Sequence, residues 1–202
     1  DINWIHRTFS VMTARTVLEL RGQRCFALAE GPVPTQNITV SRSFGRPVET
    51  LEELEQAVAQ YVSRAGEKLR SQGQCAHVLT VFAMNSRFGT DAYRHCASYI
   101  FEAGTDSSLD LTGAAGPLLE RIYRRGVKFK KAGVVLSRLV PRTALQLDLF
   151  ADRQRIERDR RLMQILDRLN RRQKQVAFAS EGIIKPWQTK FEHKSPCYTT
   201  RW

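Results

Sequence analysis

The chain has 202 residues, of which 42% are hydrophobic, enough for one packed domain with an appendage. No apolar run approaches the length that crosses a bilayer, and the start lacks a secretory-signal pattern, so we expect a cytoplasmic protein without a membrane partner. The net charge of +12 is uneven: residues 121–202 hold 21 Lys and Arg against 7 Asp and Glu, whereas residues 1–120 hold 11 against 13. Such a basic block favours a polyanionic partner, because neutralised phosphates release counterions, and a solvated surface is the alternative.

The first 30 residues are interpreted as the end of a preceding domain. Helical spacing over Arg15–Leu20 stops at Gly22, and a short apolar stretch, Cys25–Ala29, follows. Residues 31–36 contain two prolines and a glycine, which resist both helix and sheet, so this segment is expected to be a linker. A start at Asp1 rather than at Met also indicates a piece of a longer protein.

Residues 37–142 predict a complete α+β domain. Thr50 and Glu53 form a capping-box pattern, apolar residues then recur at helical spacing, and Gly73 ends the helix. The other predicted elements are strands at 37–45, 78–83, 94–101 and 134–140 and a helix at 111–125. The order β-α-β-β-α-β commonly gives a four-stranded antiparallel sheet with both helices on one face, which leaves the other face bare for a partner.

After residue 142 the composition changes. A short extended stretch at 144–151 precedes a strongly basic helix, predicted at 153–174, which also carries an apolar stripe. The polar tail that follows contains Trp187, Tyr198 and Trp202. These aromatic side chains could stack on exposed bases, but anchoring of the tail on its own domain is the preferred interpretation.

Four cysteines, Cys25, Cys75, Cys96 and Cys197, are widely spaced and form no Cys-x-x-Cys pattern. Cys75 and Cys96 each have a histidine close by in the sequence, so these residues are candidate zinc ligands. Their apolar, strand-like surroundings favour instead a role for the cysteines as small core residues. We therefore expect no metal, and no disulfides in a reducing compartment.

The most specific short motif is the pentapeptide Gln146-Leu147-Asp148-Leu149-Phe150. It resembles the peptide by which bacterial polymerases and repair proteins bind the sliding clamp. Gln146 can hydrogen-bond to a pocket rim, and Leu149 and Phe150 can fill an apolar cleft. Leu147 would pack beside them, and Asp148 would stay solvated. The alternative is an amphipathic last strand, but the position after a complete domain and before a basic helix favours a clamp ligand.

A second motif, Ser41-Arg42-Ser43-Phe44-Gly45-Arg46, follows the predicted linker. The run from Asn37 to Arg46 resembles the first strand of the little-finger domain of Y-family, lesion-bypass DNA polymerases, and the element order through residue 142 fits that domain. The end of the chain, Ser195-Pro196-Cys197-Tyr198-Thr199-Thr200-Arg201-Trp202, resembles the C-terminal region of UmuC-type members, the catalytic subunits of DNA polymerase V.

The resemblance implies a domain division and a function. The segments would be the end of a thumb (1–30), a linker (31–36), the little finger (37–142), a clamp-binding linker peptide (143–152) and a UmuC-type C-terminal region (153–202). The parent would be an error-prone DNA polymerase of SOS repair and mutagenesis, located at the bacterial nucleoid. The palm and fingers lie outside this chain, so we expect no catalytic residue and no activity here, whereas the parent should use Mg.

The resemblance also implies how DNA is held and who the partners are. The bare sheet face would lie along the duplex and contact phosphates rather than base edges. The candidate DNA-binding residues are Ser41, Arg42, Ser43, Arg46, Arg87, Lys128, Lys130, Lys131 and Arg138. The cleaved UmuD dimer and the RecA filament would be further protein partners, with the basic helix as their candidate surface.

Two other functions fit the residues. A stand-alone adaptor could bind the clamp or RecA and regulate other polymerases without polymerase activity of its own. A ferredoxin-like RNA-binding domain would display aromatic residues on its central strands for base stacking, and Phe82, Tyr99 and Phe101 are available there.

Overall fold

The computed structural model describes residues 1–27, 31, 35–86, 92–146, 151–171 and 176–189. They belong to two compact units, Asp1–Pro34 and Thr35–Trp202. The division falls inside the predicted linker 31–36, while the domain assignments themselves stay predictions.

The first unit contains helices α1 (Ile2–Thr8) and α2 (Val11–Leu20). Helix α2 begins before Arg15, where helical spacing was first recognised in the sequence. The side chain of Ser10 accepts a hydrogen bond from the Thr13 amide and so caps the helix. At its other end Gly22 has a positive φ of 81°, a conformation that suits glycine and ends the helix where the sequence indicates.

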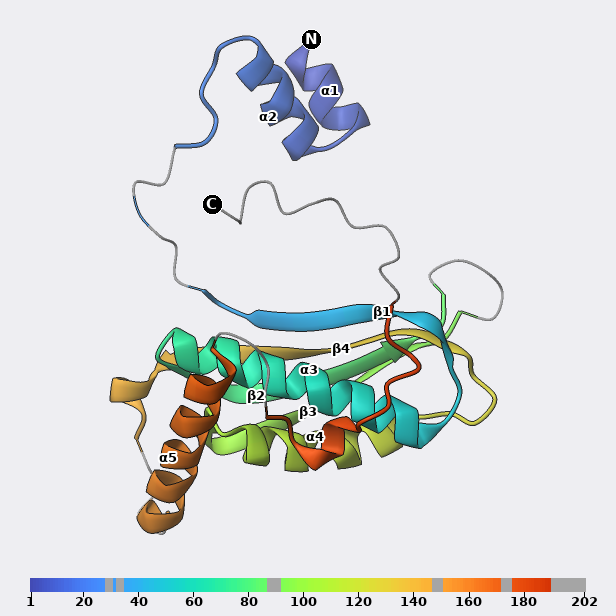
Figure 1. The fold of residues 1–202 in the computed structure, drawn as a ribbon. Helices are drawn as coiled ribbons and strands as arrows, with labels where there is room; N and C mark the ends of the chain where they lie inside the picture. Colours follow the sequence, from blue (N-terminus) through green and yellow to red (C-terminus); the bar gives the residue numbers. More distant parts are fainter. Residues whose placement is uncertain (28–30, 32–34, 87–91, 147–150, 172–175, 190–202) are drawn as a thin grey trace, which may run out of the picture. The chain divides into compact units, whose positions relative to one another are not determined.

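The second unit is built on a four-stranded sheet. Its elements are β1 (Ile38–Val48), α3 (Leu51–Ser71), β2 (Gln74–Met84), β3 (Arg94–Thr105), α4 (Ser108–Ile122) and β4 (Phe129–Pro141). The strands pair antiparallel in the order β1-β4-β2-β3. Helices α3 and α4 both lie on one face (Figure 1), which confirms the predicted fold class.

Helix α3 shows why the local signals were informative. The Thr50 side chain accepts a hydrogen bond from the Glu53 amide, as a capping box requires. The reciprocal half is not formed, because the Glu53 carboxylate pairs with Arg46 instead. At the C-terminal end Gly73 has a φ of 64° and follows the cap residue, so the helix stops where predicted.

The core lies between the two helices and the sheet. Residues of α3 such as Leu54, Val62 and Leu69 are fully buried against strand residues such as Leu79 and Leu136. Burial stabilises such a layer by about 25 cal/mol per Å² of apolar surface removed from water. Among the described residues of the second unit, no helix covers the opposite face of the sheet (Figure 1).

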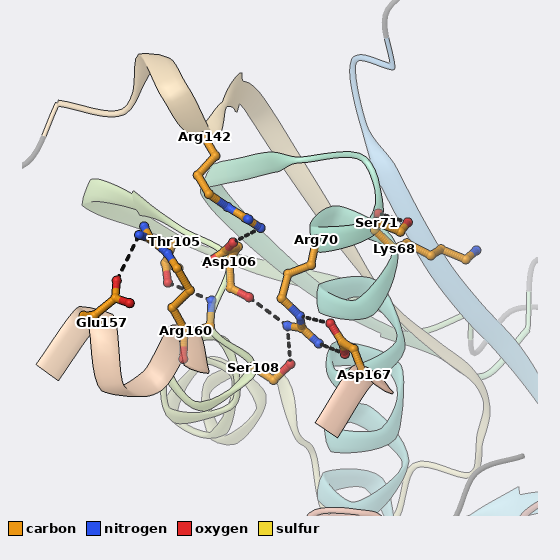
Figure 2. A network of polar contacts seen from close by, with 11 residues as sticks. Lys68, Arg70, Ser71, Thr105, Asp106, Ser108, Arg142, Glu157, Arg160 and Asp167 are labelled. Atoms are coloured by element: carbon orange, nitrogen blue, oxygen red, sulfur yellow. Dashed lines mark hydrogen bonds and ion pairs between the residues drawn. The ribbon is translucent and has the colours of Figure 1, made fainter. Parts of the chain in front are cut away.

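The C-terminal part adds the 3-10 helices η1 (Arg142–Ala144) and η2 (Ala179–Glu181) and helix α5 (Arg153–Asn170). Helix α5 packs on the sheet domain through Met163, which is buried, and through Asp167, whose two oxygens accept hydrogen bonds from Arg70 at 2.7 Å each (Figure 2). The predicted helix extends to 174, and residues 172–175 lie outside the described residues. None of the described helices has the length and apolar character needed to cross a membrane.

Residues 176–189, called the strap below, run from α5 along α3 to the outer edge of β1 (Figure 1). Trp187 of the strap is 2% exposed and belongs to the core cluster. The structure therefore confirms that Trp187 anchors the tail on its own domain, whereas Tyr198 and Trp202 lie outside the described residues.

Candidate nucleic-acid interface

The strand register separates the two faces of the sheet. Alternate residues of a strand point to opposite faces, and the buried Ile38 and Val40 mark the helix-covered face of β1. Ser41 and Ser43 alternate with them and therefore lie on the bare face, where their partners on β4 are Gly133 and Lys131. This face carries hydroxyl groups at its centre, which suit phosphate oxygens as hydrogen-bond acceptors.

The centre of the bare face is closely packed. A Cβ at Gly133 would clash with the Cβ of Ser41 and lie only 2.7 Å from Phe82 Cζ, so the Phe82 ring covers this glycine. Beside it the hydroxyl oxygens of Thr80 and Ser98 are hydrogen-bonded at 2.8 Å. The result is a smooth, uncharged centre that a duplex can approach without meeting a carboxylate.

Cations gather at one end of this face. An open depression of about 840 Å³ lies over the ends of β1, β2 and β4. Four cations line it, and none of the other described lining residues is acidic; the cations are Arg46, Arg94, Lys130 and Lys131. A concave surface with one sign of charge concentrates the field on a polyanion.

The structure brings together several of the predicted DNA-binding residues. Ser41, Ser43, Arg46, Lys130 and Lys131 all line the depression. Sequence reasoning missed Arg94, which pairs with Met84 of β2 and lies on the bare face. The sequence places it on a predicted strand, but the side that it faces depends on the strand pairing.

Other predicted residues lie elsewhere. Arg42 pairs with the buried Ala132 and so belongs to the helix-covered side of β1, where its charge opposes the burial that raises the pKa of Tyr61. Lys128 forms an ion pair with Glu49 at 3.6 Å.

Arg138 of β4 has a positive φ of 52°, and the alternation of side chains between the two faces changes around it. Leu139, which pairs with the buried Ala76, packs against the core, whereas Ser137, which pairs with Val78, does not. Arg87 lies outside the described residues. The predicted DNA-binding set stays a prediction.

Arg46 is not a free cation. Its guanidinium pairs with the Glu53 carboxylate at the start of α3, and the two side chains are 47% and 20% exposed. This pair lowers the positive potential at the rim of the depression. Arg94, Lys130 and Lys131 have no ion pair with the described residues, so they supply most of its attraction for phosphates.

Cys75 and Cys96 lie too far apart to share a metal ion. Cys75 pairs with Val140 near one end of β2. Cys96 pairs with Phe82, seven residues along β2, which at about 3.3 Å per residue is about 23 Å away. Burial, aided by the nearby Asp106, raises the pKa of the Cys75 thiol to about 11. No group of three or more potential metal ligands occurs in the described part of the chain.

The three aromatic residues considered for RNA binding do not form a base-stacking platform. Tyr99 pairs with the buried Leu79 and so lies on the helix-covered side, and Phe101 has the same alternation. Of the three aromatic residues considered for RNA stacking, Phe82 alone lies on the bare face. This arrangement favours phosphate contacts over stacking on single-stranded RNA.

The pentapeptide is described only in part. Gln146 is exposed, whereas residues 147–150 lie outside the described residues. The alternative of a last strand is not supported up to this point, because β4 ends at Pro141 and η1 follows it.

Comparison with known proteins identifies the relatives of this chain. The impB/mucB/samB family C-terminal domain matches residues 35–149, and a domain of unknown function (DUF4113) matches residues 160–202. Protein SamB of Salmonella typhimurium is 42% identical over 98% of this chain and 48% of its own length. Protein MucB of Escherichia coli is 40% identical over 100% of this chain and 48% of its own length, and protein UmuC of Salmonella typhimurium is 38% identical over 98% and 48%.

The chain thus spans about half the length of these curated relatives. Among solved structures, the insertion ternary complex of Dbh DNA polymerase resembles 69% of this chain and 39% of its own, with 13% identity and a TM-score of 0.41. The predicted resemblance to UmuC-type proteins is confirmed by the sequence relatives. Because the model of this C-terminal domain matches more than half of the chain's residues, the chain belongs to the impB/mucB/samB family.

Proposed function

We propose that this chain is the DNA-gripping, clamp-recruiting C-terminal part of an error-prone translesion DNA polymerase that acts in SOS repair and mutagenesis. The observation that carries the proposal is the bare-face depression, with four cations and no acidic residue among its described lining. Hydroxyl groups and amines bind phosphate oxygens of any sequence, and this tolerance suits a polymerase that moves along damaged template.

Duplex binding is tested by removing Lys130 and Lys131 together. Fluorescence anisotropy with a primed duplex, repeated over a series of salt concentrations, gives both the affinity and its salt slope. Two lost phosphate contacts should weaken binding for all sequences alike and reduce the salt slope by about 2. The matched control replaces Arg64 and Lys68, exposed cations of α3 on the helix-covered side, by Ala. Equal losses in both double variants would contradict a specific bare-face interface.

Clamp recruitment rests on the pentapeptide and is tested separately. Gln146, Leu149 and Phe150 are replaced together by Ala, and binding to the bacterial sliding clamp is measured beside duplex binding. Micromolar affinity for the clamp, roughly −8 kcal/mol, should disappear while duplex affinity is retained. Normal clamp binding by the triple variant would reject the pentapeptide as the ligand.

The polymerase proposal concerns the parent protein. The curated relatives are about twice as long as the part that this chain matches, which favours a polymerase part over a stand-alone adaptor. The parent would hold Mg with carboxylates of a palm domain, and the cleaved UmuD dimer and the RecA filament would be its protein partners at the nucleoid. A gene without a palm upstream of Asp1 would favour the adaptor.

A further inference from the structure

The strap closes the outer edge of β1 beside the predicted DNA contacts. β1 is an edge strand, so its outward backbone groups have no partner strand. The Gly45 amide donates a hydrogen bond to the Trp187 carbonyl at 2.9 Å, and the Thr189 hydroxyl donates one to the Ser43 carbonyl at 2.8 Å. These bonds lie on the stretch of β1 that reaches the depression.

On its inner side the same stretch of β1 is weakly held. The ladder with β4 runs regularly through Ser43 and Lys131, and then shifts register before it resumes at Val48 and Phe129. Residues 44–47 therefore lack a regular partner on β4. The strap supplies the backbone hydrogen bond that fixes this irregular stretch from outside.

Gly45 allows the close approach of the strap. A Cβ at this position would lie 2.5 Å from the Gln188 carbonyl oxygen and 3.1 Å from its carbonyl carbon. Real Cβ atoms do not tolerate such contacts with backbone, so a larger residue would push the strap off β1.

Trp187 holds the strap in place. Its ring packs edge-to-face against Phe44 of β1 and Tyr61 of α3, with centroid separations of 6.0 and 6.2 Å. A buried Trp removes a large apolar area from water, and its release would expose the core around Tyr61. Burial of Trp187 therefore anchors the strap on the folded domain.

The strap leaves the bare face open to a ligand. Its described residues contribute nothing to the lining of the depression, and Trp187 enters on the helix-covered side of β1. Ser41 and Ser43 project to the other face. A duplex on the bare face and a docked strap are compatible.

We propose that the strap is a positioning element for nucleic-acid binding: it fixes residues 43–46 of β1 so that Ser43 and Arg46 hold their places in the depression. The inference rests on the proposed DNA-binding function. It assigns a role to part of residues 160–202, the segment that matches a domain of unknown function. Trp187 and Thr189 of this segment contact β1, which belongs to the segment that matches the other family model.

The test uses two substitutions that spare Trp187 and the DNA-facing side chains. Gly45→Ala forces the strap away from β1, and Thr189→Val removes one hydroxyl with little change in shape. Gly113→Ala is the matched control, because this glycine of α4 has open space around its Cβ position. Circular dichroism and thermal unfolding first establish that each variant is folded. Affinity for primed duplex is then measured across salt concentrations.

Both strap variants should be folded and should bind duplex about threefold to tenfold more weakly, with a salt slope lower by about 1, as expected for one displaced phosphate contact. A purely structural role would change the unfolding temperature and leave the salt slope of the folded protein unchanged. The control should match the wild type in affinity and in salt slope.

Three results would overturn the proposal in distinguishable ways. Absence of duplex binding by the wild type would remove the proposed function and the strap inference together. If the wild type binds and loss of Lys130 and Lys131 weakens it, unchanged affinity and salt slope in both strap variants would refute the strap role alone. Tighter binding by the strap variants would show that the strap competes with DNA for β1.

Discussion

The attachment of α5 to the sheet domain should depend strongly on the carboxylate of Asp167. Arg70 is 6% exposed, and its Nε and one terminal nitrogen donate to the two oxygens of Asp167 at 2.7 Å (Figure 2). The other terminal nitrogen donates to the Asp106 carbonyl at 2.8 Å and to the Ser108 hydroxyl at 3.0 Å. Asp167→Ala would leave a buried guanidinium with two of its donors unpaired.

The magnitude follows from burial. Removing one partner of a fully buried ion pair costs about 3–5 kcal/mol. Asp167 is 25% exposed, so water can reach the vacated position, and we expect a loss of about 2 kcal/mol in the free energy of unfolding. For a protein of this size the loss corresponds to about 4–8 °C in Tm.

The matched control lies on the same helix. Glu157 of α5 forms ion pairs with Arg160 and Arg161 at 3.3 Å each and is 49% exposed, so Glu157→Ala should change the free energy of unfolding by less than about 0.5 kcal/mol. Urea unfolding followed by circular dichroism measures both variants, and hydrogen exchange over α5 detects local release. The reasoning would be refuted if Asp167→Ala matched Glu157→Ala in stability and in exchange.

Three further predictions concern the sheet domain. Glu53→Gln should remove the ion pair of Arg46 and so tighten duplex binding about twofold to fivefold at low salt, as measured by anisotropy. Weaker binding would contradict this. Gly133→Ala should displace the Phe82 ring and cost about 1–3 kcal/mol in urea unfolding. Folding raises the pKa of Cys75 from 9.0 to about 11, so the folded state keeps the thiol proton at a pH where the unfolded state loses it. The free energy of unfolding should therefore fall as the pH rises from about 9 to about 11, and this pH dependence should be missing in Cys75→Ala.

Local signals in the sequence predicted local structure well. The start of α3 follows from Thr50 and its end from Gly73, because caps and left-handed glycines act within one turn. The start of α4 was predicted at 111, but the helix begins at Ser108, which is buried and bonded to Arg70. The N-cap residue is Ser107, a residue type preferred at that position, so the earlier start was indicated within the segment.

The candidate site was only partly readable. Ser41, Arg42 and Ser43 were all candidates for the bare face. The register places Ser41 and Ser43 there, whereas Arg42 alternates to the other face, as the apolar Ile38 and Val40 already indicated. Pairing of Arg46 with Glu53 depends on how the turn after β1 brings two elements together. The sequence can show which residues are charged, but not which charges are already neutralised.

The position of the strap in the sequence determines when the outer edge of β1 becomes covered during synthesis. Thr189 and Ser43 are bonded although they lie 146 residues apart. Synthesis is directional, so β1 leaves the ribosome long before the segment that will cover its outer edge. An uncovered edge strand is a template for pairing with other chains. The strap contacts therefore protect β1 only after the other strands of this sheet have been made, and chains arrested before Trp187 should be prone to association.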